Sequence, residues 1–265
     1  MEIKSLLKPY LGVKLIVSSF LWNPFWTMTF LICHLHKIVL RPLLPAMKFH
    51  KSKDIDGVIF NYNIFGNLKR GDSIDICNSF SQGAELYAHR EYTQKGDYVV
   101  IVGGGYGISA VNSGNIVGSR GAVTVYEGGN ISREIIQLIK WNKLEDIVEV
   151  KSKIVGSANE LYGGRSKDSV DISPAELPSC DVLEMDCEGC EIEILENLNI
   201  RPRIIILELH PSKYQEINKK PLELLEQMNY DIVHYANQPG LPLTKQLFLQ
   251  RLSHSVGDVI IAEFT

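Results

Sequence analysis

The sequence of 265 residues is poor in cysteine and has no strong excess of charge of either sign. Five scattered cysteines cannot build a disulfide framework in a chain of this length, so we expect a reducing cytosol. A formal net charge of −4 gives no indication of nucleic-acid binding. Internal repeats and low-complexity tracts are also absent. The 45% of hydrophobic residues is typical of a globular protein. The cysteines are Cys33, Cys77, Cys180, Cys187 and Cys190.

The chain also lacks the Walker sequence of nucleotide triphosphatases, and its glycine-rich loop departs from the dinucleotide fingerprint. The apolar run 99–102 predicts a strand buried on both faces. It ends in a loop whose amides suit a polar or anionic group, although a plain tight turn is the alternative. Ile108 stands where Gly-x-Gly-x-x-Gly needs its last glycine, which disfavours NAD. The loop consists of Gly103, Gly104, Gly105, Tyr106 and Gly107.

A second apolar run, residues 122–126, ends at an acid, Glu127. A carboxylate after the second strand of a nucleoside-binding domain can accept hydrogen bonds from both ribose hydroxyls. Glu127 follows Gly103 by twenty-four residues, which is close to the separation expected for this role. The alternative is a surface acid before a Gly-Gly turn.

Strands and helices alternate over most of the chain, which predicts an α/β fold with a parallel sheet and right-handed crossovers. We expect a helix at 84–94 before the sheet and a helix at 221–229 after Pro211. The strands are expected at 98–102, 122–126, 147–151, 181–185, 203–208, 231–235 and 257–263. The intervening helices are expected at 106–118, 131–142 and 189–198.

The N-terminal part differs in charge from the rest. Residues 1–53 hold eight Lys or Arg and one acid, whereas the remainder holds nineteen basic and thirty acidic residues. Residues 15–33 carry no charge, but Asn23-Pro24 is a helix-start signal and predicts two helices, 3–21 and 24–40, rather than one span. Three alternatives stay open for this part: packing on the protein or a partner, peripheral membrane contact through residues 1–45, and a true membrane span. We therefore expect three parts: a helical segment 1–50, short strands and turns at 51–83, and the main domain at 84–265.

Acidic side chains gather after the strand 181–185. Carboxylates at this spacing repel one another and destabilise the protein unless a cation, a proton or hydroxyl donors bind them. The three residues are Asp186, Glu188 and Glu191. Cys187 and Cys190 have metal-site spacing, but a zinc site of four thiolates would need a second pair, so we interpret them as incidental.

The strand 203–208 ends in Glu208, and His210 follows it. Both can face the same sheet edge as Asp186, and histidine is the natural base near neutral pH. A turn-capping histidine before Pro211 is the alternative. The other histidines show no comparable partner in the sequence. They are His34, His36, His50, His89, His234 and His254.

Together these motifs resemble the FkbM-type methyltransferases, which are class I enzymes that use S-adenosylmethionine (SAM). The resemblance covers about residues 84–212 and is most specific in the Asp-x-Glu-Gly-x-Glu segment 186–191. The glycine loop, Glu127 and the run Pro202 to Glu208 match the rest of the pattern. The Gly-Gly-Gly-x-Gly loop and the run Val39 to Pro45 resemble the archaeal branch of the family.

The resemblance implies a Rossmann-like class I methyltransferase sheet, mostly parallel with an antiparallel C-terminal strand, after the N-terminal helical segment. It implies SAM as cofactor, held by Gly103–Gly107, Glu127 and Asp186. The reaction implied is O-methylation of a sugar hydroxyl of a glycan, glycolipid or lipid-linked saccharide. Many members carry Asp where this chain has Ile101, so Asp186 or backbone carbonyls are candidates to hold the methionine amine instead.

For catalysis we favour His210 as the base, with Asp186 or Glu188 as the rival. No metal site is assigned, and a divalent cation on Asp186 and Glu188 is an alternative. A nicotinamide-dependent oxidoreductase and an inactive protein that binds SAM or a glycan are the alternative functions. We expect a cytoplasmic enzyme with no nucleic-acid partner, and peripheral contact of its N-terminal part with the inner face of the cell membrane is an alternative.

Overall fold

The computed structural model describes residues 50–55, 58–63, 83–157, 161, 164–213, 219–237, 240–253 and 258–265. The chain forms two compact units, Met1–Lys51 with Tyr62–Phe80 and Ser52–Asn61 with Ser81–Thr265. The strands β1 (His50–Ile55) and β2 (Val58–Asn63) form a two-stranded sheet. Short strands were expected within residues 51–83, and β2 lies there.

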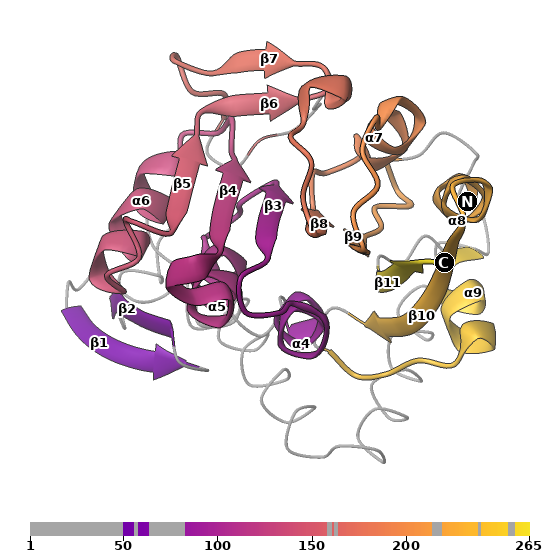
Figure 1. Cartoon of the computed structure of the whole chain (residues 1–265), viewed down its shortest axis with the longest axis horizontal. Helices are drawn as coiled ribbons and strands as arrows, with labels where there is room; N and C mark the ends of the chain where they lie inside the picture. The colour runs from indigo at the N-terminus through magenta and orange to yellow at the C-terminus, as the bar shows by residue number, and fades with distance from the viewer. Residues whose placement is uncertain are drawn as a thin grey trace, which may run out of the picture. The chain divides into compact units, whose positions relative to one another are not determined.

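The second unit is built on a seven-stranded sheet with the order β10-β11-β9-β8-β3-β4-β5 (Figure 1). Five neighbouring strands run parallel to one another, namely β5, β4, β3, β8 and β9. The strand β11 is antiparallel to both β9 and β10. The expected mostly parallel sheet with an antiparallel C-terminal strand is confirmed. The strands are β3 (Tyr98–Val102), β4 (Ala122–Tyr126), β5 (Val148–Lys151), β8 (Val182–Met185), β9 (Ile204–Glu208), β10 (Tyr230–Asn237) and β11 (Asp258–Phe264).

The apolar runs form the central strands because helices cover them on both faces. Alternation along β3 separates the faces: Ile101 lies beside Glu184 of β8, while Val102 belongs to the core on the other side. The Ile101 face is covered by α4 (Gly83–Tyr92), α5 (Ile108–Val117) and α6 (Ser132–Trp141). The opposite face packs against α7 (Glu191–Asn197), α8 (Lys220–Gln227) and α9 (Lys245–Ser253).

Three elements were not expected from the sequence. The short strands β6 (Lys153–Val155) and β7 (Val170–Ile172) pair in parallel as a separate small sheet, and α9 precedes the last strand. Strands of three residues are too short to show an alternating pattern, and residues 245–253 mix polar and apolar side chains with little periodicity. Two single-turn helices, η3 (Gly118–Arg120) and η4 (Pro174–Glu176), complete the second unit's described elements.

The predictions on the N-terminal part are not tested. The expected helices 3–21 and 24–40 lie outside the described residues, as do Cys33 and Cys77. The three-part division of the chain stays a prediction. Within the described residues, no helix has the length and apolarity needed to cross a membrane.

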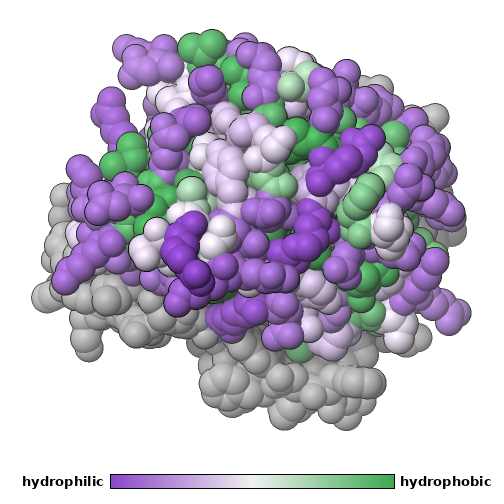
Figure 2. All heavy atoms as spheres, viewed as in Figure 1, coloured by the Kyte–Doolittle hydropathy of each residue, from purple (hydrophilic) through white to green (hydrophobic). Residues whose placement is uncertain are grey.

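Hydrophilic side chains dominate the described surface in the view of Figure 2, with hydrophobic ones interspersed. The large hydrophobic residues that the structure describes as exposed are spread over α6, α9 and three strands, so none of these elements presents a broad apolar face. They are Ile136, Trp141, Val170, Val233, Leu247 and Phe264.

Candidate functional site

The glycine loop joins β3 to α5 and brings the ends of two neighbouring strands together. Gly103 has φ +86°, and a Cβ there would lie 1.8 Å from the carbonyl oxygen of Asp186. Only glycine tolerates both the conformation and the contact. The backbone of β3 therefore turns directly against the first residue after β8.

The other loop glycines have different tasks. A Cβ at Gly104 would meet Val125 Cγ1 at 2.5 Å and Ile135 Cδ1 at 2.8 Å, so its small size serves packing beneath the loop. Gly105 lines the neighbouring cleft together with Gly103, whereas Gly104, Tyr106 and Gly107 are not among its lining residues. Part of the predicted cofactor loop thus faces a cavity, and part supports it.

Glu127 lies at the end of β4, where the sequence predicted it. Its side chain accepts a 2.6 Å hydrogen bond from the amide of Gly129, and the amides of Gly104 and Gly105 also act on it. Burial raises the pKa of this carboxyl, and those amides offset part of the shift. Glu127 is 4% exposed and lines the cleft, so a hydroxyl entering the cleft can reach an acceptor held by the loop.

The cleft is open to solvent, and the space it encloses, solvent included, is about 420 Å³. One wall is the glycine loop with Glu127, and another is formed by residues 153–155 of β6, an element that the sequence analysis missed. Asp186 and Glu188 close the end of the cleft. The remaining lining residues are Val102, Tyr126, Gly128, Leu161, Cys187 and Cys190.

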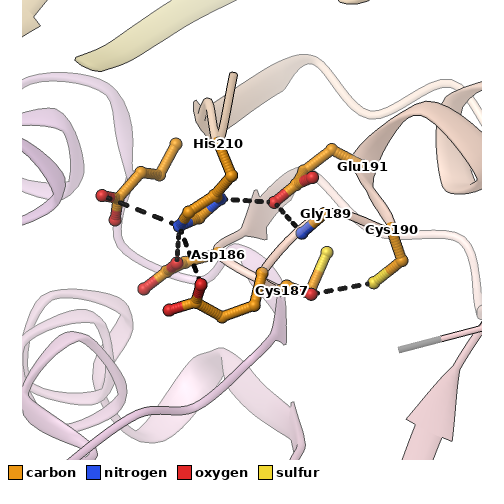
Figure 3. Close-up of polar contacts among 8 residues, drawn as sticks. Asp186, Cys187, Gly189, Cys190, Glu191 and His210 are labelled. Atoms are coloured by element: carbon orange, nitrogen blue, oxygen red, sulfur yellow. Dashed lines mark hydrogen bonds and ion pairs between the residues drawn. The ribbon is translucent and has the colours of Figure 1, made fainter. Parts of the chain in front are cut away.

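His210 meets the acidic residues of the loop after β8, as predicted. Its Nδ1 is 2.7 Å from Glu191 Oε1, and its Nε2 is 3.4 Å from Asp186 Oδ1 and 3.8 Å from Glu188 Oε2. Figure 3 shows the ring between Glu191 and Asp186. The Glu191 contact orients the ring and directs Nε2 toward the carboxylates that border the cleft. The structure therefore brings together the three predicted catalytic residues.

The carboxylates around His210 favour the protonated, positively charged form of its ring. Burial alone would lower the pKa of His210, but the hydrogen bond and charge of Glu191, with the charges of Asp186 and Glu208, raise it to about 10. Burial and the charge of Glu208 raise the pKa of Asp186 well above its usual range, although His210 opposes the shift. Burial would raise the pKa of Glu191, but His210 holds it below the usual value. At neutral pH, His210 is thus an imidazolium paired with Glu191.

Ligand atoms of Asp186, Glu188 and His210 lie within 4.8 Å of one another, so these residues could hold a divalent cation. Cys187 and Cys190 do not join them. Both thiols are buried and free, and Cys190 Sγ donates a hydrogen bond to the carbonyl oxygen of Cys187. Burial raises the pKa of Cys187, which disfavours the thiolate that metal binding or redox chemistry requires.

The expectation that His89 has no comparable partner was wrong. His89 is fully buried on α4, where Nε2 lies 2.5 Å from Glu184 Oε2 and Nδ1 lies 2.9 Å from Thr93 Oγ1. Glu184 is the β8 neighbour of Ile101, the residue that replaces an expected acid. Sequence reasoning also overlooked Glu85, a fully buried acid on the same helix. An acid within the otherwise apolar strand 182–185 was the one available signal of this buried polar layer.

The chain is similar to known proteins in part of its sequence and in its fold. Residues 158–232 match the family described as the methyltransferase FkbM domain. The fold is similar to that of a SAM-dependent O-methyltransferase from Thermotoga maritima, at 14% identity and a TM-score of 0.45, covering 81% of this chain and 77% of that chain. A SAM-dependent methyltransferase from Aquifex aeolicus is similar at 14% identity and a TM-score of 0.44, with coverage of 71% and 93%. No curated protein matches the sequence.

Proposed function

We propose that this chain, a SAM-dependent methyltransferase with an FkbM-type domain, methylates a hydroxyl group of a saccharide acceptor. The acceptor class is a glycan, a glycolipid or a lipid-linked sugar. The observation that supports O-methylation is the Glu191–His210 pair, whose Nε2 faces Asp186 and Glu188 at the end of the cleft. A histidine oriented in this way by a buried carboxylate suits removal of a hydroxyl proton.

The residues of the cleft fit the cofactor. Glu127 offers a buried carboxylate for the ribose hydroxyls, and Gly103 and Gly105 let the ligand approach the backbone of the loop. Asp186 offers negative charge toward the cationic part of SAM. When bound, SAM supplies a methyl group that its sulfonium already activates, so the protein needs to align the acceptor oxygen and remove one proton.

His210 can act as base only after it has lost the proton that its raised pKa retains in the free protein. Cationic charge beside Asp186 weakens the field that stabilises the imidazolium, so a bound cofactor lowers the pKa of His210. Nε2 would then be able to accept the proton of the acceptor hydroxyl. Asp186 or Glu188 is the second candidate for this acceptor, because both border the cleft.

The acceptor class is tested by transfer of the labelled methyl group of SAM to fractionated cell-envelope extracts. We expect label in the saccharide-containing fractions and, after acid hydrolysis, in methyl ethers of sugars identified by mass spectrometry. Label found solely in protein, nucleic acid or non-saccharide small molecules would contradict the saccharide assignment, while leaving methyl transfer itself intact.

We also propose that the basic, aromatic N-terminal part contacts the inner face of the cell membrane. Trp22 and Trp26, among eight Lys or Arg in residues 1–53, have the composition of an interfacial segment. Sedimentation with anionic vesicles tests this on the full chain. Binding should weaken in the Trp22→Ala/Trp26→Ala variant and in high salt, and a full-length protein that ignores the vesicles would refute the proposal.

A further inference from the structure

A layer of acidic side chains lies between the sheet and α4, beside the end of the cleft. Glu184 lies on β8 against α4, and Asp186, the first residue after β8, follows it by two positions and also acts on Glu85 of α4. Glu208 lies at the corresponding end of β9, and Glu85 enters the layer from α4. Glu85, Glu184 and Glu208 are each at most 5% exposed.

Glu85 differs from its neighbours because neither carboxyl oxygen has a hydrogen-bond partner at ordinary distance, although the residue is only 1% exposed. The one side chain that lowers its pKa as a hydrogen-bonding neighbour is Glu208, which is another acid. Glu184 pairs with His89, and Asp186 and Glu208 lie 3.4 and 4.0 Å from His210. Burial, followed by the charges of Asp186 and Glu184, raises the pKa of Glu85 well above its usual range. A buried polar group without a partner destabilises a protein, so its presence calls for a ligand or another role.

The ligand that fits is a cation that reaches the layer from the cleft. Asp186 connects the cleft with the acidic layer, since its side chain is 15% exposed, lines the cleft and acts electrostatically on Glu85. Gly103 packs against the backbone of Asp186, so the far end of a ligand seated on the loop comes next to this carboxylate. The adjacent strand offers no acid on this face, because its residue there is Ile101, which is fully buried.

We propose that Glu85, together with Asp186, forms an ammonium-binding subsite that holds the α-amino group of the methionine part of SAM. The inference rests on SAM being the cofactor, and it assigns to α4 a role in cofactor recognition. An ammonium donates three hydrogen bonds, which two carboxylates on opposite sides can share. It also brings positive charge to the layer, as His210 does beside Asp186 and Glu208.

The test compares two probes that differ in the amine alone. Binding of S-adenosylhomocysteine and of its deaminated analogue is measured by calorimetry on the full chain and on Glu85→Gln. The variant should weaken S-adenosylhomocysteine roughly 10- to 100-fold and leave the deaminated analogue unchanged, because loss of a charged hydrogen bond affects the amine alone. Glu91→Gln, an exposed acid on the same helix, is the matched control and should change neither affinity.

Each other outcome is informative. Equal affinities of the wild type and Glu85→Gln for S-adenosylhomocysteine would overturn the subsite, as would equal weakening of both probes. If the wild-type chain binds neither probe, the cofactor assignment fails instead. Thermal unfolding without ligand guards against misfolding: Glu85→Gln should unfold at or above the wild-type temperature, since it removes a buried acid. A variant that unfolds well below that temperature would show that Glu85 has a structural role, which contradicts the proposal.

Discussion

At the scale of single residues, the cleft depends on carboxylates whose surroundings fix their roles. Glu127 is held by the amide of Gly129, whereas Asp186 faces His210, and both carboxylates line the cleft. The first residue is thus arranged to accept hydrogen bonds from neutral hydroxyls, and the second to face positive charge. The roles of these two carboxylates can be tested separately.

Replacement of Glu127 by alanine should weaken cofactor binding. The change removes an acceptor that is 4% exposed, and buried charged hydrogen bonds of this kind are worth about 1.5–3 kcal/mol. Calorimetric titration with S-adenosylhomocysteine measures the effect, with exposed Glu134→Ala on the following helix as the control. Unchanged affinity in the Glu127 variant would remove this residue from the cofactor site.

Replacement of His210 by asparagine should separate binding from turnover. The variant loses the proton acceptor and leaves the loop and Glu127 intact, so we expect S-adenosylhomocysteine affinity within a few-fold of wild type and turnover lowered about 10²–10⁴-fold. Methyl transfer to an acceptor-containing extract provides the readout. If turnover persists and is lost in Glu188→Gln instead, the carboxylate is the better assignment for the base.

At the scale of elements, the central parallel strands β3, β4, β8 and β9 were predictable because each is buried and is followed by glycine or ends at an acid. The match of β3 and β4 to the expected ranges 98–102 and 122–126 follows from this physics. By contrast, β6 and β7 are three residues each and depend on pairing with each other, so no local sequence pattern predicts them.

The residues of the candidate site were likewise predictable only in part. Asp186, Glu188 and His210 were predictable because parallel strands end at one sheet edge, which brings together residues distant in sequence. His89 and Glu85 were not, because their neighbours on the sheet are set by the packing of α4. Helix periodicity shows that such a residue is buried but does not identify the strand residue that it meets.

The junction of β3 and β8 can be tested through two loop glycines. Gly103→Ala would force a Cβ against the carbonyl oxygen of Asp186 at 1.8 Å, so the strand ends must separate and stability should fall by about 3 kcal/mol or more. Gly104→Ala meets the side chains of Val125 and Ile135, which can shift, and should cost about 1–3 kcal/mol. Urea unfolding measures both, and an equal or reversed order would contradict the close junction.

At the scale of the whole molecule, buried acids make folding depend on pH. Burial raises the pKa of Glu85 and of Asp186, so the folded protein holds these protons more tightly than the unfolded chain does. Their contribution is present at low pH and is lost as the pH rises above the usual carboxyl range. The same layer that suits a cationic ligand therefore limits the stability of the free protein at neutral and basic pH.

His210 acts in the same direction over a higher range. Its pKa is raised from 6.5 to about 10, so its stabilising contribution is complete below about pH 6.5 and is lost as the pH rises through about 10. We therefore expect the free energy of unfolding of the ligand-free protein to fall between about pH 7 and about pH 9, measured by urea denaturation at fixed ionic strength. His210→Asn should flatten this decline, because the substituted side chain does not titrate, and bound S-adenosylhomocysteine should raise stability most at the basic end. A wild-type stability that is constant or increases over this range would show that the imidazolium and the buried acids do not titrate as the site geometry requires.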